Sequence, residues 1–288
     1  MDVKKIEGVT MKKNIKKFPF KPISSALRNI VYFVMDSVDL LLGRRDMLTP
    51  PRRLALLAGE GDYQIFGEEF LRYFIELGSL KPNETVLDIG SSIGRMAVPL
   101  TKYLDEGGSY EGFDIVKEGV DWCKRKILRR YPNFHFQLAE IFNKNYNPEG
   151  KYKAVEYTFP YKSNSFDFVF LISVFTHMLP HDIENRISEI ARVLRKDGRC
   201  LITFFLLNKE SSKLIEAKES TLDLKFVFDE YRTIDKDTPE AAIAYEEQFI
   251  RGLCGKYGLN IQEPIYYGSW SGRKEILSYQ DIIIATRG

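Results

Sequence analysis

The feature that most constrains the fold is the alternation of short apolar strands with helical segments between residues 85 and 207. Thr85–Ile89 is a continuous apolar run that leads directly into a glycine-containing turn. Similar runs, each separated from the next by a longer segment, predict further strands at 110–114, 134–138, 166–172 and 199–207. Strands that alternate with helices are typical of a mostly parallel sheet covered on both faces. We therefore expect a doubly wound α/β fold.

The segments around this region extend the expected domain to residues 61–288. Residues 67–78 predict a helix before the first strand, another helix is expected from about Arg95, and 239–257 predict one near the end. Two more strands are expected at 261–267 and 280–286, joined by a connection that includes the turn at 268–273. Residues 208–238 are polar, poorly periodic and too long for an ordinary connection, so we expect a substrate lid there.

The N-terminal segment carries a charge that the whole-chain balance conceals. Residues 1–53 hold twelve Lys and Arg against five Asp and Glu, a surplus of seven positive charges in a chain whose formal net charge is +2. Apolar residues at helical spacing predict a helix within this segment; they are Leu27, Ile30, Val31, Val34, Val38, Leu41 and Leu42. We expect residues 1–60 to form a basic helical arm packed over the domain, where it would contribute to the substrate lid together with residues 208–238. The alternative is a peripheral membrane contact with anionic lipid.

Composition excludes several classes of protein. The near-neutral charge excludes the strongly basic signature of a nucleic-acid coat. Three cysteines without a C-x-x-C pair predict free thiols in a reducing compartment, so we expect a cytoplasmic protein. Three histidines show no zinc-ligand spacing, and no metal site is expected. Asp36 and Asp39 interrupt the apolar run of the arm well short of the length of a membrane span.

Two predicted strands end in residues suited to a nucleotide. The first is followed by Gly90-Ser91-Ser92-Ile93-Gly94, where glycine lets a ligand approach the backbone and the following helix favours a negative group. The second ends at Asp114, an acid placed to accept both hydroxyls of a ribose. These features suit NAD as well as an adenosyl sulfonium cofactor, although the glycine spacing departs from the strict dinucleotide fingerprint.

Five segments in order resemble the class I S-adenosylmethionine-dependent methyltransferases, particularly the broad type 11 group. They are 88–94, 112–114, 138–140, 159–167 and 193–198. The resemblance extends over residues 60–286 and implies a Rossmann-like, seven-stranded, mostly parallel sheet with an antiparallel C-terminal strand. It also implies S-adenosylmethionine as the cofactor.

The resemblance assigns roles by position. It implies that the methionine part of the cofactor is lined by Asp88, Gly90, Ser91, Ser92 and Gly94, with Ser173 at its end. It implies that Asp114 binds the ribose and that Ile115 packs on the adenine, with Glu140 and Ile141 at the adenine edge. It also implies that Tyr63 and Gln64 belong to a segment folded over the cofactor. Two positions depart from the family pattern. Ser92 replaces the usual middle glycine, a change that requires a negative φ at this position. Glu140 replaces the more common aspartate.

His177 is the predicted catalytic base. Methyl transfer needs mainly alignment of the nucleophile, carbon and sulfur, and a hydroxyl acceptor gains further from a general base. His177 follows the fourth strand, where the resembling family places acceptor-facing residues, and imidazole is suited to proton removal near neutrality. The structural alternative is that His177 caps a helix or fills a polar gap.

Two missing motifs narrow the range of possible methyl acceptors. Residues 173–176 are not the Asn/Asp-Pro-Pro-Tyr typical of methylation at exocyclic amines of nucleic acids, and no cysteine follows a proline as in cytosine C5 methylation. We therefore expect transfer to an oxygen or nitrogen of a small-molecule, sugar or lipid-linked acceptor. The alternatives are a nucleic-acid or protein methyltransferase, an NAD-dependent oxidoreductase and a non-catalytic binding module. The sequence does not indicate which oligomeric state the protein adopts.

Overall fold

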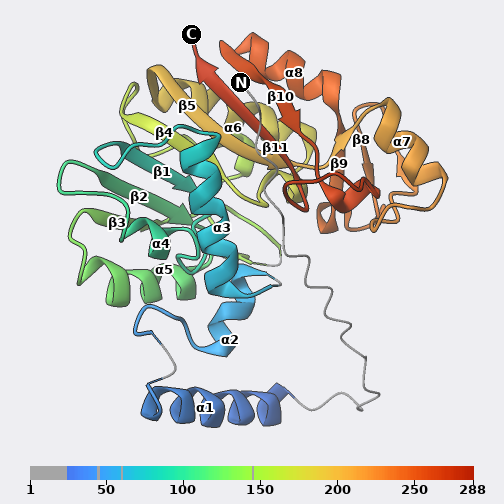
Figure 1. The fold of residues 1–288 in the computed structure, drawn as a ribbon. Coiled ribbons are helices and arrows are strands. Elements are labelled where there is room, and N and C mark those ends of the chain that lie inside the picture. Colours follow the sequence, from blue (N-terminus) through green and yellow to red (C-terminus); the bar gives the residue numbers. More distant parts are fainter. Residues whose placement is uncertain (1–24, 44–45, 60, 145) are drawn as a thin grey trace.

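A seven-stranded sheet forms the centre of the molecule (Figure 1). The structure, a computed structural model, describes residues 25–43, 46–59, 61–144 and 146–288. The strand order is β10-β11-β5-β4-β1-β2-β3. The bounds are β1 Thr85–Ile89, β2 Ser109–Asp114, β3 Phe134–Leu138, β4 Phe166–Leu171, β5 Leu194–Phe204, β10 Leu259–Tyr266 and β11 Asp281–Arg287. Only β11 runs antiparallel to its neighbours β5 and β10, so the predicted fold class is confirmed.

Helices cover both faces of this sheet. One face packs against α3 (Tyr63–Glu76), α4 (Ala97–Leu100) and α5 (Lys117–Cys123), and the other against α6 (Pro180–Val193) and α8 (Glu247–Lys256). Neighbouring residues of β1 belong to opposite cores: Val86 lies in the cluster with α3, and Leu87 in the cluster with α6. Burial on both faces explains why the strands read as continuous apolar runs.

A second, four-stranded sheet lies between β5 and α8 in the sequence. Its order is β6-β9-β8-β7, with β6 Leu206–Leu207, β7 Phe226–Val227, β8 Tyr231–Thr233 and β9 Ile243–Glu246. Asn208 caps the N-terminus of the helix α7 (Lys209–Glu216). Its side chain accepts hydrogen bonds from two amides of the first turn. Residues 208–238 therefore contain a helix and two strands, although their polar sequence predicted no regular elements.

Two predicted helices differ from the observed elements. The helix expected at 239–257 is wrong in its first half, where a short 3-10 turn (Pro239–Ala241) and β9 precede α8. Ile243–Glu246 is drawn into the second sheet by pairing with β6 and β8. The helix expected from Arg95 is shortened to α4, because the turn after β1 continues through Met96.

The helix α1 (Ser25–Leu41) lies apart from the central sheet, with α2 (Arg52–Ala55) between them (Figure 1). Its apolar residues are solvent-exposed, Val34 by 54% and Leu41 by 86%. The expectation that the helix packs over the domain through this face is therefore wrong. The part of the predicted arm before residue 25 lies outside the described residues. Among the helices that the structure describes, none combines the length and the hydropathy needed to cross a membrane.

Candidate functional site

The turn after β1 is held against the end of β2. The amides of Gly90 and Ser91 both donate to the carbonyl of Phe113, at 3.0 and 3.1 Å. Gly90 has a φ of +91°, and a Cβ at this position would lie 2.5 Å from Cγ2 of Val174. Glycine is therefore required here both by the left-handed backbone and by the side chain that follows β4. The turn lies at the carboxyl ends of parallel strands, where this class of fold binds its ligands.

Asp114 joins the turn to the start of α5. Its Oδ2 accepts from the amide of Ser92 and its Oδ1 from the amide of Val116, both at 2.7 Å. Burial raises the pKa of this carboxyl, and the backbone amides act in the opposite direction. Each carboxylate oxygen can accept a second hydrogen bond. The side chain can therefore hold two ribose hydroxyls while it keeps both amides.

The two serines of the turn differ in environment. Ser91 is buried, and its Oγ has no hydrogen-bond partner among the described residues. An unsatisfied buried hydroxyl is costly unless a ligand group completes it, so the turn fits a polar ligand. Ser92 has a φ of +46°, which corrects the expected negative value. Its Oγ donates to the carbonyl of Leu57 at 3.1 Å, a contact that helps to hold this strained backbone.

Asp88 lies beneath the turn and is almost completely buried. The hydroxyl of Tyr110 donates to its Oδ2 at 2.6 Å. The Tyr110 side chain can pass over Gly112 to reach Asp88 on β1 because Gly112 has no side chain. A Cβ at position 112 would lie 2.8 Å from the tyrosine oxygen. Burial raises the pKa of Asp88 to about 8, with the Tyr110 hydrogen bond opposing the rise. The carboxyl is therefore protonated at neutral pH.

This protonation predicts a pH-dependent stability that Asp88→Asn removes. Because the folded-state pKa of about 8 lies above the ordinary 3.8, the folded chain holds a proton that the unfolded chain releases between these values. The stabilisation from the protonated group is complete at low pH and is lost as pH rises towards 8. In urea unfolding, Asp88 should contribute a loss of about 1 kcal/mol per pH unit between pH 5 and 7 to the wild-type profile.

Asp88→Asn imitates the protonated acid and should lack this component of the slope. The exposed Asp223, replaced by asparagine, is the matched control and should keep the wild-type slope. Parallel pH profiles for Asp88→Asn and the wild type would contradict the assignment.

The residues predicted for the adenine lie at the ends of β2 and β3. The two strand ends are joined by the amide of Ala139, which donates to the carbonyl of Asp114 at 2.8 Å. Ile115 is half-buried against the core, and Ile141 is buried. Glu140 pairs with the Nζ of Lys151 at 2.6 Å and remains partly exposed. The structure thus brings these three predicted residues to the same edge as Asp114.

Ser173 and His177 follow β4 on the other side of the turn. The amide of Ser173 donates to Oγ1 of Thr203 at 2.8 Å, and its hydroxyl donates to Oε1 of Gln280 at 3.1 Å. His177 is exposed, and its Nδ1 lies 2.8 Å from the carbonyl oxygen of Glu240. Because a carbonyl only accepts, Nδ1 carries the hydrogen in this bond. The neutral ring then has its lone pair on Nε2, as a base requires.

Tyr63 and Gln64 differ in how they meet the turn. Tyr63 is buried, and its hydroxyl donates to the carbonyl of Ile93 at 2.9 Å. Gln64 is exposed and donates from Nε2 to Oγ1 of Thr49 at 3.0 Å. Tyr63 therefore supports the turn by a hydrogen bond to the turn's backbone, whereas the Gln64 side chain bonds to the segment before α2.

Several residues that hold the site in place were not predicted from the sequence. Tyr110 could have been found, since it stands two positions before Gly112 on the same strand face. Thr203 reaches Ser173 through the pairing of β5 with β4, and Gln280 reaches it through the pairing of β11 with β5, for which the local sequence has no signal. Gly59 accepts from Nη2 of Arg95 at 3.0 Å, which places residues 57–59 against the turn.

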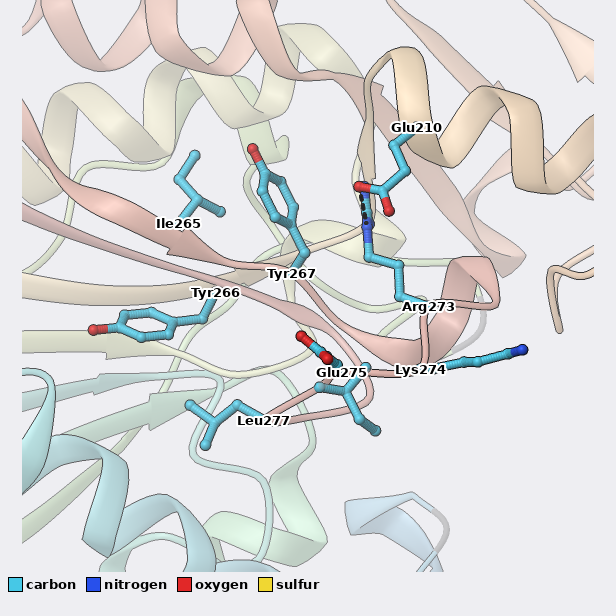
Figure 2. A pocket seen from close by; sticks show the side chains of 9 residues that line it. Glu210, Ile265, Tyr266, Tyr267, Arg273, Lys274, Glu275 and Leu277 are labelled. Atoms are coloured by element: carbon cyan, nitrogen blue, oxygen red, sulfur yellow. Dashed lines mark hydrogen bonds and ion pairs between the residues drawn. The ribbon is translucent and has the colours of Figure 1, made fainter. Parts of the chain in front are cut away.

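A pocket of about 600 Å³ lies beside β10 and the connection to β11 (Figure 2). Arg273 stands at its edge, with its guanidinium 4.4 Å from the centre of the Tyr267 ring and its Nε 3.0 Å from Oε2 of Glu210. The lining consists of Glu210, Ile265, Tyr266, Tyr267, Arg273, Lys274, Glu275, Ile276 and Leu277. We call it the β10–β11 pocket. Among the described residues, no group of acidic, histidine or cysteine side chains is arranged to hold a metal.

The sequence comparisons find a methyltransferase domain within the chain. Residues 87–202 match the family of the methyltransferase domain. A curated relative from Thermoplasma acidophilum, named "Probable cobalt-precorrin-6B C(15)-methyltransferase (decarboxylating)", is 28% identical over 78 residues. That match covers 26% of this chain and 38% of the relative, so the similarity spans well under half of either protein.

Solved structures share the fold. The PH0226 protein from Pyrococcus horikoshii OT3 has a TM-score of 0.53 and 16% identity, over 80% of this chain and 93% of its own. The 1,6-didemethyltoxoflavin-N1-methyltransferase of Burkholderia thailandensis, with bound 1,6-didemethyltoxoflavin and S-adenosylhomocysteine, has a TM-score of 0.50 and 14% identity, over 93% and 92%. The chain therefore contains a segment that matches a methyltransferase domain, within a fold that it shares with these solved structures.

Proposed function

We propose that this protein transfers a methyl group from S-adenosylmethionine to an oxygen or nitrogen of a small-molecule, sugar or lipid-linked acceptor. The observation that carries the proposal is the placement of His177. It follows β4 three residues after Val174, the side chain that packs on Gly90 of the turn. Its Nδ1 is occupied by the carbonyl of Glu240, which leaves Nε2 available to an acceptor.

Each part of the site has a distinct task in this reaction. The bound cofactor supplies an electrophilic methyl carbon. Asp114 accepts the ribose hydroxyls, and the turn Gly90–Gly94 admits the methionine portion against the backbone. His177 would take the proton of a hydroxyl acceptor at Nε2 as the methyl group is transferred. Glu240 lies in the 3-10 turn between β8 and β9, just after the expected lid at residues 208–238, so the second sheet and its connections would form the acceptor side.

The β10–β11 pocket supports a small acceptor. Its volume of about 600 Å³ falls within the range typical of small-molecule sites. Its wall at Leu277 is three residues from Gln280, which bonds to Ser173 beside the turn. The carbonyl of Leu277 also accepts from the Tyr73 hydroxyl of α3 at 2.6 Å. None of the predicted site residues lines the pocket, and its connection to the turn runs through the segment that carries Gln280.

His177→Ala is expected to lower kcat by about 100-fold for a hydroxyl acceptor, because general-base assistance is lost. The dissociation constant of S-adenosylhomocysteine should stay unchanged, since the turn and Asp114 are untouched. Single-turnover transfer and calorimetry measure the two quantities. His181→Ala is the matched control, because His181 is an exposed histidine in the next helix and should retain wild-type turnover. Equal kcat for the His177 variant and the wild type would remove it as the base.

The acceptor class is tested with methyl-labelled cofactor and a fractionated cell extract. Mass analysis should find the label in a small-molecule, sugar or lipid fraction. Label in RNA, DNA or protein would replace the proposal by macromolecular methylation. S-adenosylhomocysteine binding without label in any fraction would support a non-catalytic binding module instead.

A further inference from the structure

We infer that α1 docks this protein on an anionic lipid bilayer through an apolar stripe on its outward face. The stripe consists of Leu27, Ile30, Val31, Val34, Val38 and Leu41, all solvent-exposed. Their spacing places them along one side of the helix at about 100° per residue. These six large apolar side chains share one face, and Phe33, Met35 and Leu40 elsewhere on α1 are also exposed, so the helix presents a large apolar binding surface.

The opposite side of α1 is fixed to the protein by charge. The guanidinium of Arg52 bonds to Oδ1 of Asp36 at 2.8 Å and to Oδ2 of Asp39 at 2.5 Å. The backbone amide of Arg52 also donates to Oδ2 of Asp36 at 3.1 Å. Asp36 lies about 180° around the helix from the centre of the stripe. The contact with α2 therefore directs the stripe away from the domain, in agreement with the position of α1 in Figure 1.

The charge of the neighbouring sequence favours a lipid surface as the partner. Residues 1–24 contain seven lysines and only two acidic residues. A basic segment beside an amphipathic helix is attracted to anionic headgroups, while the apolar face enters the headgroup boundary. The two acids of α1 are both paired with Arg52, so they oppose this attraction less than free carboxylates would. Lysines on the chain also complement an anionic bilayer better than a second copy of the same basic segment.

Docking through α1 is connected to the cofactor turn. Arg52 begins α2, and Arg53 pairs with Glu118 at the start of α5. The following residues contact the turn itself, through the carbonyls of Leu57 and Gly59. A bilayer held by α1 is therefore linked by one short segment to the residues that bind the cofactor. This arrangement suits an acceptor presented at a membrane, although the docking itself does not depend on methyl transfer.

Vesicle flotation of the full chain tests the inference. Vesicles of phosphatidylcholine with about 30% phosphatidylserine should bind the protein about tenfold more strongly than phosphatidylcholine alone, and high salt should reduce this difference. Val34→Asp places a charge in the middle of the stripe and should lower the partition coefficient about tenfold. Val227→Asp on β7 is the matched control, because Val227 is 65% exposed and remote from α1 in the sequence; it should bind as the wild type does.

A second variant tests the charge separately. Replacement of Lys12, Lys13, Lys16 and Lys17 by glutamine should weaken binding to the anionic vesicles and leave binding to neutral vesicles unchanged. Unfolding midpoints equal to that of the wild type will show that the variants are folded. Wild-type binding by Val34→Asp, or no binding of the wild type to anionic vesicles, would overturn the inference. So would a lipid-free dimer that Val34→Asp dissociates, since a second copy would then cover the stripe. Flotation needs no methyl donor, so its outcome is independent of the proposed activity.

Discussion

Replacement of Asp114 by alanine is expected to raise the dissociation constant of S-adenosylhomocysteine about 100-fold or more, because a buried carboxylate that can accept two ribose hydroxyls is lost. The change also removes the acceptor of the Ser92 amide, so the turn itself is loosened. Isothermal titration calorimetry measures the effect directly. Asp114→Asn should also bind weakly, because its amide nitrogen would face one of the two backbone amides that now donate to the carboxylate.

Two controls separate cofactor binding from folding. Asp121→Ala removes an exposed acid of α5 that pairs with Lys117, and its dissociation constant should equal that of the wild type. Thermal unfolding without ligand will show how much stability Asp114→Ala loses. Wild-type affinity in a folded Asp114→Ala protein would place the ribose elsewhere.

Asp281→Ala is expected to lower the free energy of unfolding by about 3 to 5 kcal/mol. The fully buried carboxylate accepts from the amides of Leu206 and Gly268, each at 2.6 Å, and from Nε1 of Trp270 at 2.7 Å. Alanine would leave these three donors buried without a partner. Burial raises the pKa of Asp281 to about 6, while the three hydrogen bonds act against the rise. Since this value is above the ordinary one, the group stabilises most at low pH and loses that contribution as pH rises to 6.

Urea unfolding at pH 7 measures the loss. Asp223→Ala is the control, since this side chain is 81% exposed, and it should change the free energy by less than about 0.5 kcal/mol. A loss below about 1 kcal/mol for Asp281→Ala would mean that water or a local rearrangement satisfies the three donors.

The sequence predicts the central sheet because each parallel strand is buried on both faces. Val86 and Leu87 enter different cores, so β1 has to be apolar throughout. The strand β9 has no comparable signal, since its short run becomes a strand only by pairing with β6 and β8. The periodicity of α1 was visible, but periodicity alone does not say what covers an apolar face.

The candidate site was predictable at strand ends and not at long-range contacts. Asp114 and the glycines were predictable as candidate site residues because Asp114 ends β2 and the glycines stand in the turn after β1. The positive φ of Ser92 does not, because it accompanies a contact with Leu57 that lies 35 residues earlier in the chain. The two partners of Ser173 likewise depend on pairing between distant strands: Thr203 on the register between β4 and β5, and Gln280 on the register between β5 and β11.

The pairing of β6 with β9 has a consequence for how such a chain can diversify. Leu206 and Tyr245 are neighbours in parallel register, and the Tyr245 amide donates to the Phe205 carbonyl at 2.8 Å. The chain thus leaves the central sheet and comes back to it at adjacent points. An evolving gene could lengthen, shorten or exchange the stretch between them without moving β5 or α8. Recognition of new acceptors could then arise by replacing one inserted module while the methyl-donor half is inherited intact.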